Sequence, residues 1–230
     1  MQTSDSIVII PTYNEKENIE NIIRAVFGLE KTFHILVIED NSPDGTADIV
    51  RRLQKEFPER LFMIERKGKL GLGTAYITGF KWSIEKGYDY IFEMDADFSH
   101  NPNDLPRLYK ACHDEEADVS IGSRYVSGVN VVNWPMGRVL MSYFASKYVR
   151  FITGLPIHDT TAGFVCYRRK VLETIHLDHI RFKGYAFQIE MKFTAFKCGF
   201  HITEVPVIFI NRELGTSKMN SSIFGEAVFG

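Results

Sequence analysis

Two carboxylates separated by a single residue are the groups in this sequence best placed to do chemistry. Asp95 and Asp97 follow the mostly apolar run 90–94 and precede Ser99 and His100. Unpaired charges are costly inside a strand, so both carboxylates should lie where the strand leaves its sheet. Side chains two residues apart on an extended segment point the same way, and paired carboxylates repel each other unless a cation lies between them. The pattern therefore favours a site for Mg²⁺ or Mn²⁺ and a phosphate-bearing ligand; the alternative is an Asp-rich turn that caps the next helix.

The segments that must position these carboxylates alternate between strand and helix. Strand-like apolar runs and stretches with apolar residues at helical spacing alternate four times, with the strands at residues 7–10, 34–38, 61–64 and 90–94. Short connections between such elements predict an α/β fold with a mostly parallel central sheet and helices on both faces. Further strands are predicted at 118–121, 165–167 and 201–210, and further helices at 134–152 and 187–197.

The first four predicted strands end in polar or charged residues. Their exits read Pro11-Thr-Tyr-Asn-Glu15, Glu39-Asp40, Arg66-Lys67 and Asp95-Ala-Asp97. Ligands of such sheets bind outside the carboxyl ends of the strands. Converging polar exits describe a nucleotide-sized crevice, which makes the functional interpretation of Asp95 and Asp97 stronger than the capping one.

The glycines of Gly71-Leu-Gly-Thr-Ala-Tyr76 do not form a known phosphate-binding loop. The segment lacks the third glycine of a dinucleotide fingerprint and follows the third strand rather than the first. The sequence also contains no Gly-x-x-x-x-Gly-Lys-Ser/Thr, which excludes a P-loop nucleotide hydrolase. We expect these glycines to let the backbone approach a ligand or, as the favoured interpretation, to pack a helix tightly.

Composition indicates one soluble domain in a reducing compartment. With 230 residues, 45% of them hydrophobic, the chain can bury the core of one large domain. No apolar run approaches the ~20 residues of a membrane-spanning helix, and residues 1–5 lack the basic start of a signal peptide. Cys112, Cys166 and Cys198 are isolated in the sequence, which argues against a disulfide framework or a zinc site.

Charge is divided unevenly along the chain. Residues 1–123 hold 14 Lys and Arg against 22 Asp and Glu, a formal charge of −8, and residues 124–230 hold 13 against 7, a charge of +6. The net charge of −2 gives no reason to expect nucleic acid as a partner. We therefore predict a front half built around a cation and a back half built around anions.

Basic groups of the back half are candidates to meet these anions. Arg124 follows the strand 118–121, where a guanidinium could bind phosphate. The segment from Arg212 to Lys218 is suited to closing over a pyrophosphate, and a plain basic surface loop is the alternative. The helix 134–152 carries an apolar stripe flanked by basic residues: Leu140, Phe144, Tyr148 and Phe151, with Arg138, Lys147 and Arg150. Packing against the core is the expected role of this stripe, and a membrane-surface helix is the second interpretation.

An ordered set of motifs resembles the inverting family 2 glycosyltransferases, and in particular the dolichyl- or polyprenyl-phosphate mannosyltransferases. The motifs are Pro11-Thr-Tyr-Asn-Glu15, Glu39-Asp-Asn-Ser-Pro-Asp-Gly-Thr46, Lys69-Leu-Gly-Leu-Gly-Thr-Ala-Tyr76, Asp95-Ala-Asp97, Gly122-Ser-Arg-Tyr125, and Arg212 with Gly215, Ser217 and Lys218. Each motif alone is weak, but the ordered set is specific and covers essentially the whole chain. The chain looks like the short soluble type without a membrane-spanning extension. Ser99 departs from members that place Gln near the metal.

The resemblance implies a GT-A type fold and a metal-dependent, inverting transfer of mannose from GDP-mannose to a polyprenyl (dolichyl-type) phosphate. By motif position it implies nucleotide-binding roles for Pro11, Tyr13, Glu15, Glu39, Asp40, Lys69 and Asp95. Asp95 and Asp97 would hold Mg²⁺ or Mn²⁺, with Asp97 as the direct ligand and a catalytic residue. The phosphates of donor and acceptor would meet Arg124, Arg138, Thr161, Arg212 and Lys218, of which Arg124 and Arg212 would also be catalytic.

One glycosyltransferase domain is expected over residues 1–230. Residues 1–123 would form the nucleotide-sugar and metal half, residues 124–218 the acceptor half, and residues 219–230 the start of an interfacial helix. A lipid acceptor implies that the protein works at a membrane surface, peripherally on the cytoplasmic face. A membrane-anchoring partner subunit is also possible. The alternatives are a polyprenyl-phosphate glucosyltransferase that uses UDP-glucose and, in a different class, a sugar-phosphate nucleotidyltransferase, which would carry a Gly-rich basic loop after its first strand.

Overall fold

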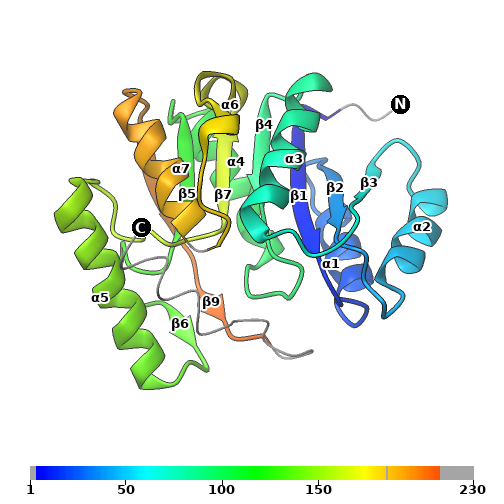
Figure 1. The fold of residues 1–230 in the computed structure, drawn as a ribbon, viewed down its shortest axis with the longest axis horizontal. Helices are drawn as coiled ribbons and strands as arrows, with labels where there is room; N and C mark the ends of the chain where they lie inside the picture. Colours follow the sequence, from blue (N-terminus) through cyan, green and yellow to red (C-terminus); the bar gives the residue numbers. More distant parts are fainter. Residues whose placement is uncertain (1–3, 185, 213–230) are drawn as a thin grey trace.

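A seven-stranded sheet forms the centre of the protein (Figure 1). The computed structural model describes residues 4–184 and 186–212. The strands lie in the order β3-β2-β1-β4-β7-β5-β8. Their bounds are β1 (Ser6–Thr12), β2 (His34–Glu39), β3 (Leu61–Glu65), β4 (Tyr90–Glu93), β5 (Val119–Ser123), β7 (Val165–Arg168) and β8 (Ile202–Pro206). Neighbouring strands are parallel except that β7 runs antiparallel to both β4 and β5, so the predicted mostly parallel α/β sheet is confirmed.

Helices cover both faces of this sheet, as predicted. One face packs against α3 (Leu72–Glu85), α6 (Arg169–Thr174) and α7 (Ala186–Lys197), and the other against α1 (Ile19–Phe27), α2 (Thr46–Glu56) and α4 (Leu105–His113). Successive residues of a strand point to opposite faces, so Ile7 and Ile9 join one core while Val8 and Ile10 join the other. Burial on both faces explains why these strands are apolar without alternation. The 3₁₀ turn η1 (Pro102–Asp104) lies between β4 and α4, and η2 (Leu177–His179) lies between α6 and α7.

The parallel register brings the ends of β1, β2 and β4 to one edge of the sheet. Thr12 at the end of β1 lies opposite Glu39 at the end of β2, and Ile9 lies opposite Glu93 at the end of β4. The Met94 N–H still donates to the Ile9 carbonyl at 3.2 Å, and the chain then leaves the sheet. The predicted pair of carboxylates therefore lies just beyond the strand.

One strand predicted from the sequence has the wrong extent. Residues 201–210 form two strands, β8 in the main sheet and β9 (Phe209–Ile210), which pairs in parallel with β6 (Val131–Val132) in a separate two-stranded sheet. β8 is an edge strand that ends at Pro206, a position where a missing N–H is tolerated, and the Val207 N–H makes the last bond, to the Ser123 carbonyl at 3.0 Å. The break matters for the site, because it directs β9 to the Asp-rich turn, where the Ile210 N–H donates to the Ser99 carbonyl at 3.3 Å.

Helix α5 (Met136–Thr153) lies at the outer edge of the molecule beside β6 (Figure 1). The expected core packing of its apolar stripe is wrong, because the four side chains are exposed: Leu140 (48%), Phe144 (59%), Tyr148 (53%) and Phe151 (86%). The helix instead buries Ser146 and Val149. Across the described ranges, α5 included, we find no helix with the length and apolar character needed to cross a bilayer.

Candidate functional site

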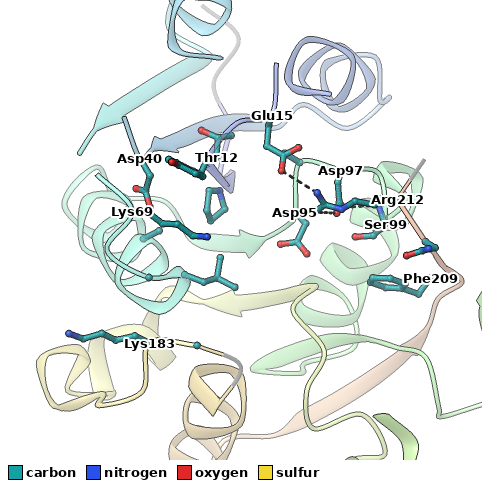
Figure 2. A pocket seen from close by; sticks show the side chains of 18 of the residues that line it. Thr12, Glu15, Asp40, Lys69, Asp95, Asp97, Ser99, Lys183, Phe209 and Arg212 are labelled. Atoms are coloured by element: carbon teal, nitrogen blue, oxygen red, sulfur yellow. Dashed lines mark hydrogen bonds and ion pairs between the residues drawn. The ribbon is translucent and has the colours of Figure 1, made fainter. Parts of the chain in front are cut away.

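A cavity of about 360 Å³ opens at the sheet edge where β1, β2 and β4 end (Figure 2). Most of the site residues predicted from the sequence line it: Pro11, Tyr13, Glu15, Asp40, Lys69, Asp95, Asp97, Arg138 and Arg212. The wall also contains residues that sequence reasoning did not assign to the site: Thr12, Gly71, Leu72, Ala75, Ala96, Ser99, Lys183, Gly184, Phe209 and Asn211. The structure thus brings together residues from both charged halves of the chain.

Hydrogen bonds fix the turn that carries the two carboxylates. Asp97 accepts the Ser99 N–H on Oδ1 at 3.0 Å, and the Asp95 N–H donates to His100 Nδ1 at 3.2 Å. Burial lowers the pKa of His100 to about 4, so its ring is a neutral acceptor at physiological pH. The cap of the following 3₁₀ turn is Asn101, whose side chain accepts the Asn103 N–H. Capping of the next turn therefore does not account for Asp95 and Asp97.

The two carboxylates differ in their electrostatic surroundings. Burial disfavours the charged form of Asp97, but hydrogen bonds from Ser99 and the charge of Arg212 outweigh it and lower the pKa of Asp97. Burial and the neighbouring charge of Asp97 raise the pKa of Asp95 to about 7. Asp95 is thus a carboxylate that additional positive charge would stabilise.

The donor set at this turn fits a hard divalent cation. Carboxylate oxygens are the ligands that Mg²⁺ and similar ions prefer, and Mg²⁺ typically takes one or two protein carboxylates together with substrate phosphates and water. Within residues 4–184 and 186–212 no group of three or more His, Cys, Asp or Glu side chains is arranged to hold a metal alone. Asp95 and Asp97 could therefore supply two ligands and leave the others to a bound phosphate and water.

Arg212 lies between two acidic side chains of the cavity (Figure 2). Its Nη2 contacts Asp97 Oδ2 at 2.5 Å, and its Nη1 is 3.8 Å from Glu15 Oε1. Glu15 is held in turn by the Asn18 amide, which donates to Oε2 at 3.0 Å. The acidic end of the cavity therefore already contains a cation supplied by the chain.

A second arginine of the cavity is anchored by an aromatic ring. The Arg138 guanidinium carbon lies 4.0 Å from the centre of the Trp134 ring, and Nη1 donates to Asn211 Oδ1 at 3.2 Å. The Asn211 N–H donates to Val132 at 3.0 Å. Helix α5 and the small β6–β9 sheet thus hold Arg138 near the segment that carries Arg212.

The opposite end of the cavity is built from the exits of β1, β2 and β3. Arg66 donates two hydrogen bonds of 2.6 and 2.7 Å to the Asp40 carboxylate and a third, of 2.8 Å, to Thr74 Oγ1. Lys69 Nζ lies 5.4 Å from the centre of the Tyr13 ring. This end combines a fixed carboxylate, an aromatic face and a cation.

Gly73 lets a distant segment reach the cavity wall. Its N–H donates to the Lys183 carbonyl at 2.9 Å, and a Cβ at this position would lie 2.7 Å from Phe187 Cδ2 and 2.9 Å from the Phe182 carbonyl oxygen. The favoured interpretation of this glycine as a close-packing residue is therefore confirmed. Lys183 and Gly184 line the cavity as a result, but nothing local in their sequence signals this.

Three predicted site residues lie outside the cavity wall. Arg124 makes hydrogen bonds of 2.7 and 2.6 Å to the buried Asp159 and one of 2.8 Å to Thr161 Oγ1. Its guanidinium lies 5.6 Å from the centre of the ring of Phe209, which lines the cavity. Glu39 accepts the N–H groups of two following residues at 2.8 Å each and so shapes the turn after β2. Direct ligand contacts by Arg124, Thr161 and Glu39 stay predictions, and Lys218 lies outside the described residues.

A buried polar chain behind the site was not anticipated from the sequence. Gln188 donates to Glu93 Oε2 at 2.6 Å, and the Lys192 ammonium donates to the carbonyls of Ala162 and Thr160 at 2.6 and 3.3 Å. Burial raises the pKa of Glu93 to about 8 and lowers that of Lys192 to about 8. Helix α7 thereby ties the end of β4 to the segment that holds Arg124.

Comparison with known proteins identifies close relatives. A family model described as glycosyl transferase family 2 matches residues 7–176. A polyprenol monophosphomannose synthase from Mycolicibacterium smegmatis is 48% identical over 227 residues, which cover 99% of this chain and 85% of that protein. An undecaprenyl-phosphate mannosyltransferase from Micrococcus luteus is 46% identical over 222 residues, which cover 96% of this chain and 90% of that protein.

Solved structures share the fold at low sequence identity. A mannosyltransferase from Pyrobaculum calidifontis, in complex with GDP-Man and Mn²⁺, has a TM-score of 0.63 at 18% identity, over 93% of this chain and 58% of that one. Glucosyl-3-phosphoglycerate synthase from Mycobacterium tuberculosis, in complex with Mn²⁺ and UDP-glucose, has a TM-score of 0.65 at 18% identity, over 96% of this chain and 74% of that one. The predicted GT-A type fold is therefore confirmed.

Proposed function

The chain belongs to glycosyl transferase family 2, and we propose that it transfers mannose from GDP-mannose to a polyprenyl phosphate with inversion at the sugar. The observation that carries this proposal is one cavity whose wall contains both the paired carboxylates Asp95 and Asp97 and the arginines Arg138 and Arg212. Such a cavity suits two anionic substrates, one of them bound through a cation. The names of both close relatives, a polyprenol monophosphomannose synthase and an undecaprenyl-phosphate mannosyltransferase, support the choice of sugar and acceptor.

Asp95 and Asp97 would hold the divalent cation of this reaction. When bound there, Mg²⁺ or Mn²⁺ would neutralise the negative charge that develops on the departing nucleoside diphosphate. The raised pKa of Asp95 supports this role, because a carboxyl group with a pKa of about 7 is only partly ionised at neutral pH unless positive charge is added beside it. The Mn²⁺ in the two solved structures of this fold is in keeping with it.

The donor and the acceptor would approach from different sides of the cavity. We place the nucleoside near Tyr13, Asp40 and Lys69, because this end offers an aromatic face and a carboxylate held in place by Arg66. The diphosphate then reaches the Asp95 turn, and Arg212 would meet both this diphosphate and the acceptor phosphate, which Arg138 also contacts. These arginines would bring a second anion within attack distance of the sugar.

The acceptor needs no strong general base. The second pKa of a phosphate monoester is ~6, so the attacking oxygen is largely ionised at neutral pH. A single in-line displacement by this oxygen inverts the configuration of the sugar carbon. The work left to the protein is to orient two anions and to stabilise the leaving group.

A panel of nucleotide sugars with a short-chain polyprenyl phosphate tests the proposal. We expect GDP-mannose to give a kcat/KM at least about tenfold above UDP-glucose, a difference of ~1.4 kcal/mol. A higher kcat/KM with UDP-glucose would favour the polyprenyl-phosphate glucosyltransferase alternative. Membership of a glycosyl transferase family leaves the sugar-phosphate nucleotidyltransferase alternative without support.

The exposed side of α5 supports action at a membrane surface. Phe144 and Phe151 point away from the core, and the helix carries Arg138, Lys147 and Arg150 but no acidic residue. Apolar side chains flanked by cations are typical of helices that lie in the surface of an anionic bilayer. The unpaired cysteines fit the cytoplasmic face, where thiols stay reduced.

Replacing Phe144 and Phe151 together by Ser should weaken binding to vesicles that contain anionic lipid by at least about tenfold. Burial of one Phe side chain contributes roughly 1.5–3 kcal/mol, so the loss of two exceeds tenfold even with partial insertion. Vesicle co-sedimentation measures the effect, with Leu70→Ser, which changes a 56% exposed side chain outside α5, as the control. Equal vesicle binding by both variants would contradict membrane docking through α5. A membrane-anchoring subunit would then be the alternative partner of the exposed apolar side of α5.

A further inference from the structure

Arg212 uses the oxygen of Asp97 that the turn leaves available. Asp97 Oδ1 accepts the Ser99 N–H, and Oδ2 accepts Arg212 Nη2 at 2.5 Å. Only 9% of the Asp97 side chain and 8% of the Glu15 side chain are exposed, so the guanidinium lies between two nearly buried carboxylates. An ion pair in such surroundings is screened less than one at the surface.

A divalent cation and this guanidinium compete for the same carboxylate. A metal must be given a lone pair of Asp97, and a strong charge-assisted hydrogen bond already takes one of the two on Oδ2. The positive charge of Arg212 would also repel a second cation at this distance. Occupation of Asp97 by Arg212 therefore works against metal binding.

We propose that Arg212 is a competing cation that weakens metal binding to Asp97 until a nucleoside diphosphate binds and draws the guanidinium away. The inference rests on the proposed metal site at Asp95 and Asp97. In the absence of nucleotide, Arg212 neutralises the acidic end of the cavity. When diphosphate is present, its oxygens offer Arg212 a new anionic partner, and Asp97 becomes available to the metal.

The backbone before Arg212 is held by contacts that do not involve its guanidinium. Asn211 is tied to β6 through its N–H and to Arg138 through its side chain. The Arg212 side chain is itself 21% exposed, and its contact with Glu15 is long at 3.8 Å. Rotation of the side chain could thus transfer the guanidinium from Asp97 to a diphosphate without unfolding β9.

Competition of this kind makes metal and diphosphate bind synergistically. Each ligand relieves an obstacle to the other, and linkage requires the effect to be equal in both directions. Removal of the guanidinium should therefore change the two affinities in opposite directions. Metal alone should bind more tightly, and diphosphate should bind less tightly.

Mn²⁺ binding to the full chain, followed by the electron paramagnetic resonance signal of free Mn²⁺, tests this inference without any turnover. We expect Arg212→Gln to bind Mn²⁺ about tenfold more tightly than the unchanged protein when no nucleotide is present, because a charge-assisted hydrogen bond to Asp97 is lost. Added GDP should increase Mn²⁺ affinity in the unchanged protein by a larger factor than in the variant. Arg138→Gln is the matched control, since it removes the same charge from the same cavity; we expect it to change Mn²⁺ affinity less than about threefold.

The possible outcomes separate this inference from the proposed function. Unchanged or weaker Mn²⁺ binding by Arg212→Gln overturns the competition, and so does equal tightening in Arg138→Gln, which would indicate a general charge effect. Asp97→Asn reports on the metal site itself. If that variant loses Mn²⁺ while Arg212→Gln behaves like the unchanged protein, only the competition is wrong; if it retains Mn²⁺ fully, the metal assignment fails as well.

Discussion

Asp97→Asn is expected to lose transfer activity by about 10³-fold while the fold is retained, since the change removes negative charge at the point where the leaving diphosphate must be held. The amide has nearly the shape of the carboxylate and can still accept the Ser99 N–H that fixes the turn. Arg212 keeps its second acidic neighbour, Glu15. Loss of the charge-assisted hydrogen bond between Asp97 and Arg212 should lower the free energy of unfolding by about 1.5–3 kcal/mol, which leaves the protein folded.

Initial rates of mannose transfer to a short-chain polyprenyl phosphate, measured over a range of Mn²⁺ concentrations, check this expectation. Asp48→Asn serves as the control, because it changes an exposed carboxylate whose partner is Arg51 on the surface of α2. The control should match the unchanged protein in rate and in metal dependence. If Asp97→Asn keeps a rate within tenfold of the unchanged protein and the same Mn²⁺ dependence, Asp97 is not a metal ligand.

The centre of the site could be predicted because its signals are local. An apolar run that gives way to Thr12, Glu39 or Asp95 marks the carboxyl end of its strand, and parallel pairing brings such ends together whatever the rest of the chain does. Asp95 and Asp97 lie outside the sheet because of the local conformation of the turn that follows β4. For these residues the sequence pattern and the structure agree.

The remaining cavity residues come from pairings between distant segments. Lys183 reaches the wall only because Gly73 allows helix α3 to approach it, and Phe209 and Asn211 do so because the strand predicted over 201–210 breaks after Pro206. The insertion of β7 between β4 and β5 is equally non-local. The sequence pattern of one segment does not predict which distant segment it will pack against.

Helix α5 shows a limit of a different kind. Apolar residues at helical spacing indicate that one side of a helix leaves water, but the spacing is the same whether that side meets the protein core or a bilayer. The sequence therefore predicted the stripe of Leu140, Phe144, Tyr148 and Phe151 correctly and its environment incorrectly. The basic residues that flank the stripe, Arg138, Lys147 and Arg150, were the signal that favoured the membrane interpretation.

Asp159→Ala should destabilise the protein by about 3–5 kcal/mol, because it leaves the buried Arg124 guanidinium without its carboxylate. Asp159 is fully buried and accepts the backbone N–H of Arg124 at 3.0 Å as well as both side-chain bonds. Burial opposes ionisation of Asp159, but the charge and hydrogen bonds of Arg124 outweigh it and lower the pKa of Asp159. Its contribution to stability is therefore complete above pH ~4 and is lost as the pH falls through the lowered pKa. Urea denaturation at pH 7 and at pH 3.5 would show the difference between the two proteins shrinking at the lower pH.

Replacing both partners, as Arg124→Met with Asp159→Leu, should recover most of the lost stability, since an apolar pair of similar size removes both buried charges at once. This double variant also tests whether Arg124 binds a substrate phosphate. Arg124 contacts Asp159 and Thr161 and does not line the cavity, so we expect transfer to stay within about tenfold of the unchanged protein. A stable double variant whose rate falls as far as that of Asp97→Asn would instead place the guanidinium on a substrate phosphate, as the motif resemblance predicts. A large loss of stability in the double variant would show that the ion pair is needed to shape the segment 159–162, independently of its charge balance.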